Sequence, residues 1–263
     1  MSDLHFGARN GLDDPALERA IGELVAGVSP DLVVASGDLT HRGRPAEHAA
    51  AAGYLRALRR PLLVVPGNHD IPTLPPARLL RPFAAFERSF GTVSPLHQAE
   101  GLTVVGVCSV TPWGYQRGHV RAGELERAER RLRAAPAGAF RVVVLHHQLL
   151  GAPWRNTKLP VARRTRLLGR LAGAGAELVL GGHIHQAAVA ERRAFEVVAG
   201  ARAQACVLAT APGLGRPRPA RAYEARGVLV HRADERAITV DVHVWRREAF
   251  ALAASSTFPR GPG

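Results

Sequence analysis

The sequence predicts a layered α/β fold with two β-sheets packed together, and three observations lead to this prediction. Short apolar runs alternate with helical stretches up to residue 185. Three strand-like runs then follow one another, at 195–209, 225–233 and 237–247. The 263 residues are 46% apolar and contain no repeat or linker, so they suffice for one large core. We therefore expect a single domain over 1–250 and a flexible tail over 251–263.

Helices and strands are expected from different local signals. The helix at 13–28 has Asp14 as its N-cap and Pro15 at its first position, and its apolar residues recur with helical spacing. The strands are short apolar runs, several of which stop at Gly-Asp, Asn-His or a His pair. In chain order, the other expected elements are a strand at 31–38, a helix at 44–58, a strand at 61–70, a helix at 80–91, a strand at 102–110, a helix at 123–135, a strand at 140–147, a helix at 163–175 and a strand at 177–185.

The net charge of +13 raises the question of a nucleic-acid partner. Lys158 is the only lysine, so 34 of the 35 basic residues are arginine, and they are scattered over the expected helices. They do not form one stripe interleaved with aromatic residues. A nucleic-acid partner is therefore possible but not favoured, and we expect a general attraction for anionic substrates.

Membrane and redox signals are weak in this sequence. It has no run of about 18 apolar residues, and its first residues lack the apolar core of a signal peptide. Cys108 and Cys206 sit within apolar runs, without disulfide or zinc-finger spacing, so we expect buried free thiols. We expect a cytoplasmic protein without a membrane partner.

Polar residues able to bind a metal occur where the expected strands end. The carboxyl ends of strands are where α/β folds build their sites, so these residues are expected to converge. Oxygen and nitrogen donors without cysteine favour divalent ions of the Mn, Fe, Zn or Co class, and an Asp carboxylate can bridge two such ions. A His-x-His on extended backbone would place both imidazoles on one side. The residues are Asp3, His5, Asp38, Asn68, His69, His146, His183 and His185.

Five ordered blocks carry a resemblance to a known family. SDLHFG, SGDLTHRG, VPGNHD, VVLHHQ and GGHIHQ, spread over residues 2–186, resemble the blocks of the calcineurin-like metallophosphoesterases. GDLT and GNHD look most like those of the bacterial class III cyclic nucleotide phosphodiesterases. The resemblance implies a four-layer α/β/β/α sandwich of two packed mixed β-sheets flanked by helices.

The same resemblance implies a role for each matching residue. His147 would lie beside the ligands, and His69 would stabilise or protonate the leaving oxygen while Asp70 orients its ring. A hydroxide bridging two divalent ions would attack phosphorus in line. One ion would be held by Asp3, His5 and His185, the other by Asn68, His146 and His183, with Asp38 bridging them.

Some positions depart from the family pattern. Relatives carry an apolar strand before the Asp-x-His block, whereas here Met1 takes its last position, so the first strand is expected to be truncated by a misplaced start. We expect such a chain to be unstable or poorly active. His41 would touch substrate or lie exposed in a loop, and Trp113 and Tyr115 would wall the pocket or pack in the core. The loop at 213–222 is a candidate for substrate choice, which the sequence does not reveal.

These observations favour a dinuclear-metal phosphoesterase that hydrolyses a small phosphodiester, with cyclic nucleotides as the favoured class. One alternative is a nuclease of the DNA-repair exonuclease branch, although this chain has little room for the capping segments of that branch. The lipid A precursor pyrophosphatase branch is disfavoured. A different class of function, a non-catalytic binding protein with the same fold, would lack the metals. The oligomeric state stays open.

Overall fold

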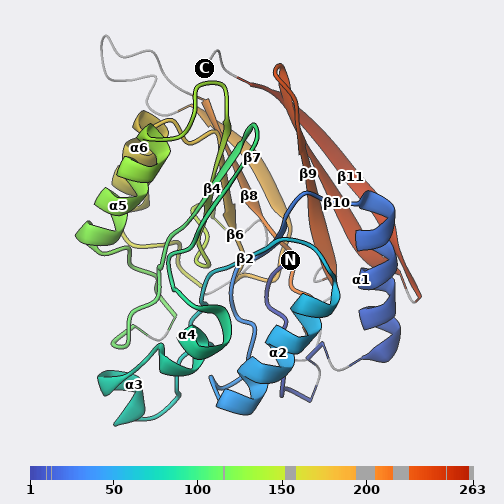
Figure 1. Cartoon of the computed structure of the whole chain (residues 1–263), viewed down its shortest axis with the longest axis vertical. Helices are drawn as coiled ribbons and strands as arrows, with labels where there is room; N and C mark the ends of the chain where they lie inside the picture. Colours follow the sequence, from blue (N-terminus) through green and yellow to red (C-terminus); the bar gives the residue numbers. More distant parts are fainter. Residues whose placement is uncertain are drawn as a thin grey trace.

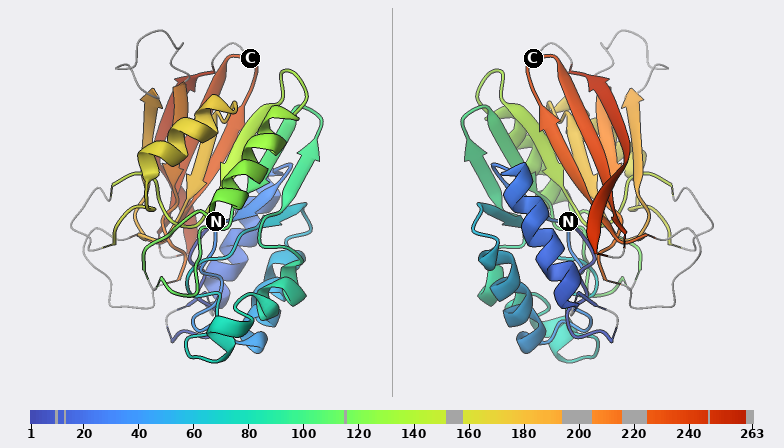
Figure 2. Two further views of the ribbon diagram at one scale, coloured as in Figure 1. Left: turned by 90° about the vertical axis from the view of Figure 1, so that its left-hand side faces the viewer. Right: turned by 90° about the vertical axis from the view of Figure 1, so that its right-hand side faces the viewer.

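The computed structural model describes residues 1–9, 11–12, 14–114, 116–151, 158–193, 205–215, 225–246 and 248–260. Two β layers lie between two helical layers (Figures 1 and 2). The larger layer is a six-stranded sheet in which the four inner strands are parallel and each edge strand is antiparallel to its neighbour. Its order is β3 (Leu96–Ala99), β4 (Leu102–Gly106), β5 (Phe140–Val144), β6 (Leu178–Gly181), β8 (Ala205–Thr210) and β7 (Ala188–Arg193).

The second β layer consists of two pieces. A parallel pair, β1 (Val33–Ala35) and β2 (Leu62–Val64), lies beside an antiparallel sheet of β9 (Gly227–Ala233), β10 (Ala237–Arg246) and β11 (Ala249–Pro259). Alternate residues of the strands face opposite layers, as the pleat requires. In β5, Val142 and Val144 face the second β layer, whereas Val143 packs in the core beneath the helices.

Five of the helices within the described ranges cover the outer faces of the two β layers. The helices α5 (Ala122–Arg133) and α6 (Arg164–Gly173) pack on the large sheet. On the other side, α1 (Pro15–Val28), α2 (Pro45–Ala57) and α4 (Ala84–Phe90) share a core with β1, β2 and partly buried residues of the C-terminal sheet, and the short α3 (Ala77–Leu80) precedes α4. No helix within the described ranges combines the length and the apolar character needed to cross a membrane. The predicted four-layer α/β architecture is confirmed.

Local signals explain the helix starts and most differences in strand length. The backbone N–H groups of Ala16 and Leu17 donate to the Asp14 side chain, so the predicted N-cap of α1 is present. The strands are shorter than expected because the residues after them form tight loops and not extended backbone. Of the expected strand at 195–209, the residues before 205 lie outside the described residues, as do Tyr115 and residues 216–222 of the 213–222 loop.

The expected flexible tail is replaced by a strand over the residues that the structure describes. Residues 251–259 belong to β11, which pairs with β10 along its whole length and includes one irregularity in register beside Val242. The sequence signal was weak because most β11 side chains are exposed and polar or small. Pairing with a strand already fixed in the sheet supplies the hydrogen bonds that hold this segment.

The first residues are held by backbone bonds although they form no regular strand. The Met1 nitrogen donates to the Val34 carbonyl oxygen at 2.8 Å, and the Asp3 and Phe6 N–H groups donate to the loop that follows β1. Leu4 and Phe6 are buried in the core shared with α1 and α2. Asp3 is therefore placed next to the end of β1 by its neighbours on both sides.

Candidate metal centre

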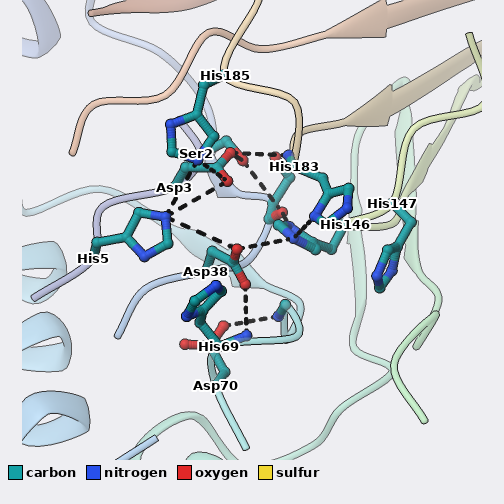
Figure 3. Close-up of polar contacts among 12 residues, drawn as sticks. Ser2, Asp3, His5, Asp38, His69, Asp70, His146, His147, His183 and His185 are labelled. Carbon is teal, nitrogen blue, oxygen red and sulfur yellow. Dashed lines mark hydrogen bonds and ion pairs between the residues drawn. The ribbon is translucent and has the colours of Figure 1, made fainter. Parts of the chain in front are cut away.

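Four loops and the N-terminal segment bring the predicted ligands together (Figure 3). The loops follow β1, β2, β5 and β6, whose carboxyl ends lie at the same edge of the fold. All the ligands except His185 are buried, and its side chain is 16% exposed. We call the following set the candidate metal centre: Asp3, His5, Asp38, Asn68, His146, His183 and His185.

One group of candidate ligands comes from the first and the last of the five sequence blocks. The Asp3 Oδ1 atom lies 3.1 Å from the Nε2 atom of His185. The Nε2 atoms of His5 and His185 are 3.4 Å apart. These three residues offer ligand atoms within 4.8 Å of one another, which a divalent ion can draw together.

A second group lies directly beside the first. The His146 Nε2 atom is 3.3 Å from the Oδ2 atom of Asp38 and 3.2 Å from the Nδ1 atom of His183. The same Asp38 oxygen lies 3.9 Å from the Nε2 atom of His5, which belongs to the first group. Asp38 therefore lies near residues of both groups.

Asn68 enters this arrangement through a close backbone contact. It is buried, and it follows Gly67, whose α-carbon lies so near Asp38 that an added Cβ would come within 2.2 Å of the Asp38 nitrogen. Only glycine allows the two loops to approach so closely. The Asn68 side-chain oxygen is buried and has no hydrogen-bond partner.

The backbone of the candidate ligands differs from the extended conformation that we expected for the His-x-His pair. Five ligands have left-handed φ angles between 51° and 74°. Such conformations are rare for residues other than glycine and cost of order 1–3 kcal/mol each. Each pair thus converges through a tight turn and not through strand alternation, so that expectation was wrong. The five residues are Asp3, His5, Asp38, His183 and His185.

Buried polar atoms without partners show that these residues fit divalent cations. Oδ1 of Asp3 and Oδ2 of Asp38 are buried beside the imidazole nitrogens of His185 and His146, at 3.1 and 3.3 Å, and Nε2 of His183 is shielded from water without a hydrogen-bond partner. Burying a polar atom without a partner costs about 1–3 kcal/mol. A cation bound among them would supply the missing partner and use the oxygen and nitrogen donors present.

The electrostatic environment keeps most ligands in the form that binds metal. Burial favours the neutral form of Asp38, but the neighbouring His146 outweighs it and holds the pKa of that carboxyl well below its usual range. Burial lowers the pKa of His5 to about 3 and that of His183 well below its usual value, so both rings are neutral. Burial also opposes the charge of His146, yet Asp38 raises its pKa to about 9.

Hydrogen bonds behind the ligands fix which atoms face the centre. The Nδ1 atom of His146 donates to the Ser36 carbonyl oxygen at 2.8 Å, so Nε2 points at Asp38. The Oδ2 atom of Asp3 accepts from the Ser2 hydroxyl at 2.6 Å and from the His183 N–H at 3.0 Å. Such supporting bonds orient ligands and raise their affinity for metal.

His69 lies at the edge of the centre, next to Asp38. Its backbone N–H donates to Asp38 Oδ1 at 2.8 Å, and its ring Nδ1 donates to the carbonyl oxygen of His41, also at 2.8 Å. A proton fixed on Nδ1 leaves Nε2 as the ring atom that can exchange a proton with a bound molecule.

Asp70 does not orient the His69 ring, contrary to our expectation. Its carboxylate accepts hydrogen bonds from the N–H groups of Gly67, Leu39 and Thr40, at 2.8, 3.2 and 2.9 Å. The physical reason is that tight buried loops leave backbone N–H groups unpaired, and these need an acceptor. Asp70 therefore ties the loop that carries Asp38 to the loop that carries Asn68.

The structure also places three further residues that the sequence left open. The His147 ring lies 4.7 Å from that of His183 and bonds to the Ser109 hydroxyl at 2.9 Å, beside the ligands. His41 is only partly buried, and with His5 and His69 it forms a third group of neighbouring imidazoles. Trp113 is 79% exposed, so it does not pack in the core. Ser109 was missed because nothing in its sequence position marks it.

The family model described as calcineurin-like phosphoesterase matches residues 1–187. The chain belongs to this family. In this calcineurin-like protein, the two groups of candidate ligands come from four of the five blocks that carried the resemblance, and Asn68 comes from the fifth.

Curated relatives share parts of the chain. A glycerophosphodiester phosphodiesterase of Enterobacter lignolyticus is 42% identical over 77 residues, 27% of this chain and 28% of that protein. A cAMP/cGMP dual specificity phosphodiesterase of Mycobacterium tuberculosis is 29% identical over 63% of this chain and 53% of its own. A probable cyclic nucleotide phosphodiesterase of Rhodococcus erythropolis is 27% identical, with shares of 72% and 65%. The chain thus spans less than two thirds of the length of each.

Solved structures show the same fold at low identity. A purple acid phosphatase from yellow lupin superposes with a TM-score of 0.67 at 11% identity, covering 98% of this chain and 52% of that one. A dimetal phosphatase from Danio rerio gives 0.65 at 12% identity, with shares of 99% and 98%.

Proposed function

We propose that the protein is a two-metal phosphodiesterase that acts on a small phosphodiester, with cyclic nucleotides as the favoured class. One observation carries the proposal: two groups of buried ligands adjoin each other, with Asp38 between them. The arrangement suits a pair of divalent ions that share one carboxylate. The buried oxygens of Asp3 and Asp38, which lie against imidazole nitrogens, and the unpartnered buried oxygen of Asn68 support the same interpretation.

The chain's own residues would divide the work as follows. Asp3, His5 and His185 would hold one ion, and Asn68, His146 and His183 the other. Bound divalent ions supply charge neutralisation for a phosphate and lower the pKa of water to near neutrality. His69, with its Nδ1 proton fixed by the His41 carbonyl, would give a proton from Nε2 to the leaving oxygen.

The names of the relatives bear on the substrate class. Two of them are named for cyclic nucleotides and one for glycerophosphodiesters, and all three are named as phosphodiesterases. The net charge of +13 favours an anionic substrate of either kind. We propose cyclic nucleotides because those relatives match more of this chain.

Metal analysis combined with a substrate panel tests the proposal. The purified protein, reconstituted with Mn²⁺, is expected to retain about two ions per chain and to hydrolyse bis(p-nitrophenyl) phosphate and cyclic AMP. The His146→Gln variant should lose metal and activity, whereas His97→Gln, a matched change on β3, should keep both.

Two outcomes of the same experiment would contradict the proposal. Metal content near zero after reconstitution with Mn, Fe, Zn or Co would favour the non-catalytic binding protein. Hydrolysis of linear DNA far exceeding that of cyclic AMP and bis(p-nitrophenyl) phosphate would favour the nuclease.

A further inference from the structure

Exposed apolar side chains gather on three segments of the chain. Within the described residues, seven large apolar side chains are exposed, and five of them lie on the segments 71–82, 109–121 and 158–164. Three of the five are more than two-thirds exposed, with Trp113 at 79%. Large apolar side chains exposed on neighbouring segments indicate a surface that meets something other than water. We call these five the apolar rim: Leu74, Leu79, Leu80, Trp113 and Leu159.

The three segments are tied to one another although they lie far apart in the sequence. The Arg78 guanidinium is buried and donates to the carbonyl oxygens of Pro72 at 2.9 Å and Pro112 at 2.8 Å, which holds α3 against the Trp113 loop. The Ala162 N–H donates to the Gly118 carbonyl oxygen at 2.8 Å, which joins the second segment to the third. The rim residues are therefore presented by one connected structure.

The same segments border the candidate metal centre. Ser109, at the start of the second segment, bonds to the His147 ring, and an added Cβ on Gly118 would meet that ring. Lys158, on the third segment, donates to the His183 carbonyl oxygen. The first segment begins directly after Asp70. In Figure 1, α3 lies at the lower end of the molecule, beyond the ends of the sheet strands.

The charge of these segments is of one sign. They contain seven arginine and lysine residues and no aspartate or glutamate. Because the chain as a whole has 22 acidic residues, their absence here leaves a local excess of positive charge around the leucines and the tryptophan. The basic residues are Arg78, Arg81, Arg117, Arg121, Lys158, Arg163 and Arg164.

Leucine, tryptophan and arginine together match the chemistry of an anionic lipid surface. Leucines enter the boundary of the acyl chains, tryptophan prefers the headgroup level, and each basic residue near an anionic surface adds to the attraction. A nucleic-acid base would instead require stacking on aromatic rings, and four of the five rim residues are leucines. We propose that the apolar rim docks this protein on an anionic lipid bilayer and places the metal centre next to the headgroup layer.

We expected no membrane partner because the sequence has neither a long apolar run nor the apolar core of a signal peptide. The rim is assembled from three segments in which the helical residues are those of α3 and Arg164 at the start of α6, so no sequence periodicity indicates it. The surface exists only in the folded chain.

Vesicle binding by the metal-loaded protein tests the proposal. We expect co-sedimentation with vesicles of phosphatidylglycerol and phosphatidylcholine, and much weaker binding to phosphatidylcholine alone. The double variant Leu74→Ser/Leu80→Ser should reduce the partition coefficient about tenfold or more, since each leucine loses a large part of its transfer free energy. The matched control is Leu96→Ser/Leu252→Ser, which changes two exposed leucines outside the rim and should bind as the wild type does.

A second measurement follows the rim directly. The fluorescence of the protein should shift to the blue on binding anionic vesicles, and Trp113→Phe should remove that shift. The proposal is overturned by absence of binding, by equal binding to vesicles without phosphatidylglycerol, or by equal losses in the two double variants. Hydrolysis of a soluble diester is measured in a separate experiment. The result of vesicle binding therefore does not decide whether the proposed function is correct.

Discussion

Replacing Asp70 by asparagine tests whether this residue holds the loops of the metal centre together. One carboxylate oxygen accepts from the N–H groups of Leu39 and Gly67, and the other from the N–H and hydroxyl groups of Thr40. Asparagine keeps the shape but has only one oxygen. Its amide group is expected to face Thr40, because the Thr40 hydroxyl can accept a hydrogen bond whereas the Thr40 N–H cannot.

The expected loss of folding stability in Asp70→Asn follows from this geometry. One buried backbone donor, the N–H of Thr40, is left without an acceptor, which costs about 1–3 kcal/mol. Burial already raises the pKa of Asp70, so removing its charge also removes part of a desolvation cost and the loss should not exceed this range. Since the loops of Asp38 and Asn68 lose a shared brace, Mn²⁺ affinity should fall in the same variant.

Urea unfolding of the metal-free protein and Mn²⁺ titration measure the two effects. The matched control is Asp234→Asn: Asp234 also accepts two backbone N–H bonds, from Arg236 and Ala237, but with a single oxygen in an exposed turn. The free energy of unfolding of Asp234→Asn should differ from that of the wild type by no more than about 0.5 kcal/mol. The proposed role of Asp70 in holding the two loops together is wrong if Asp70→Asn has the same urea midpoint as the wild type, or if both variants lose the same stability.

Three more predictions concern separate features. His69→Ala should lower turnover about 100-fold with unchanged metal content. Unaltered turnover would mean that His69 only helps to form the turn. Gly37→Ala should weaken metal binding, because φ is +89° and the new Cβ would lie 2.7 Å from His146 Nδ1; wild-type titration would contradict this. The Ser255 bond and Arg232 lower the pKa of Asp241, so stability should fall below about pH 4, less steeply in Asp241→Asn during acid unfolding.

Much of the metal centre could be predicted because its residue types follow apolar strands in a fixed order. Carboxylates, an amide and imidazoles at the carboxyl ends of parallel strands are expected to converge whatever the detailed loop geometry, and the ligand atoms of Asp38, His146 and His183 do lie within 4.8 Å of one another. The loop geometry could not be predicted in the same way. It depends on contacts between loops, such as the approach of Gly67 to Asp38, that local sequence does not encode.

The errors have the same origin. Asp70 follows His69 directly, which suggested a pair, but unpaired N–H groups on a neighbouring loop compete for its carboxylate. Residues 251–259 look too polar and small for a strand, yet β10 offers them a complete ladder. In both cases a partner distant in sequence decides the conformation. Propensity and periodicity describe only the near neighbours.

The candidate metal centre contains strained backbone and an unpaired buried atom, and the contacts around it explain how the fold holds these residues in place. Left-handed backbone at five candidate ligands and the unpartnered buried oxygen of Asn68 are costs that other contacts of the folded chain offset. Backbone bonds from Asp3 and His5 to the loop after β1, together with the Asp70 brace, hold the ligands in place at this cost. A cation bound among these side chains would use donors that other contacts of the chain position, so we expect metal binding to raise the free energy of unfolding.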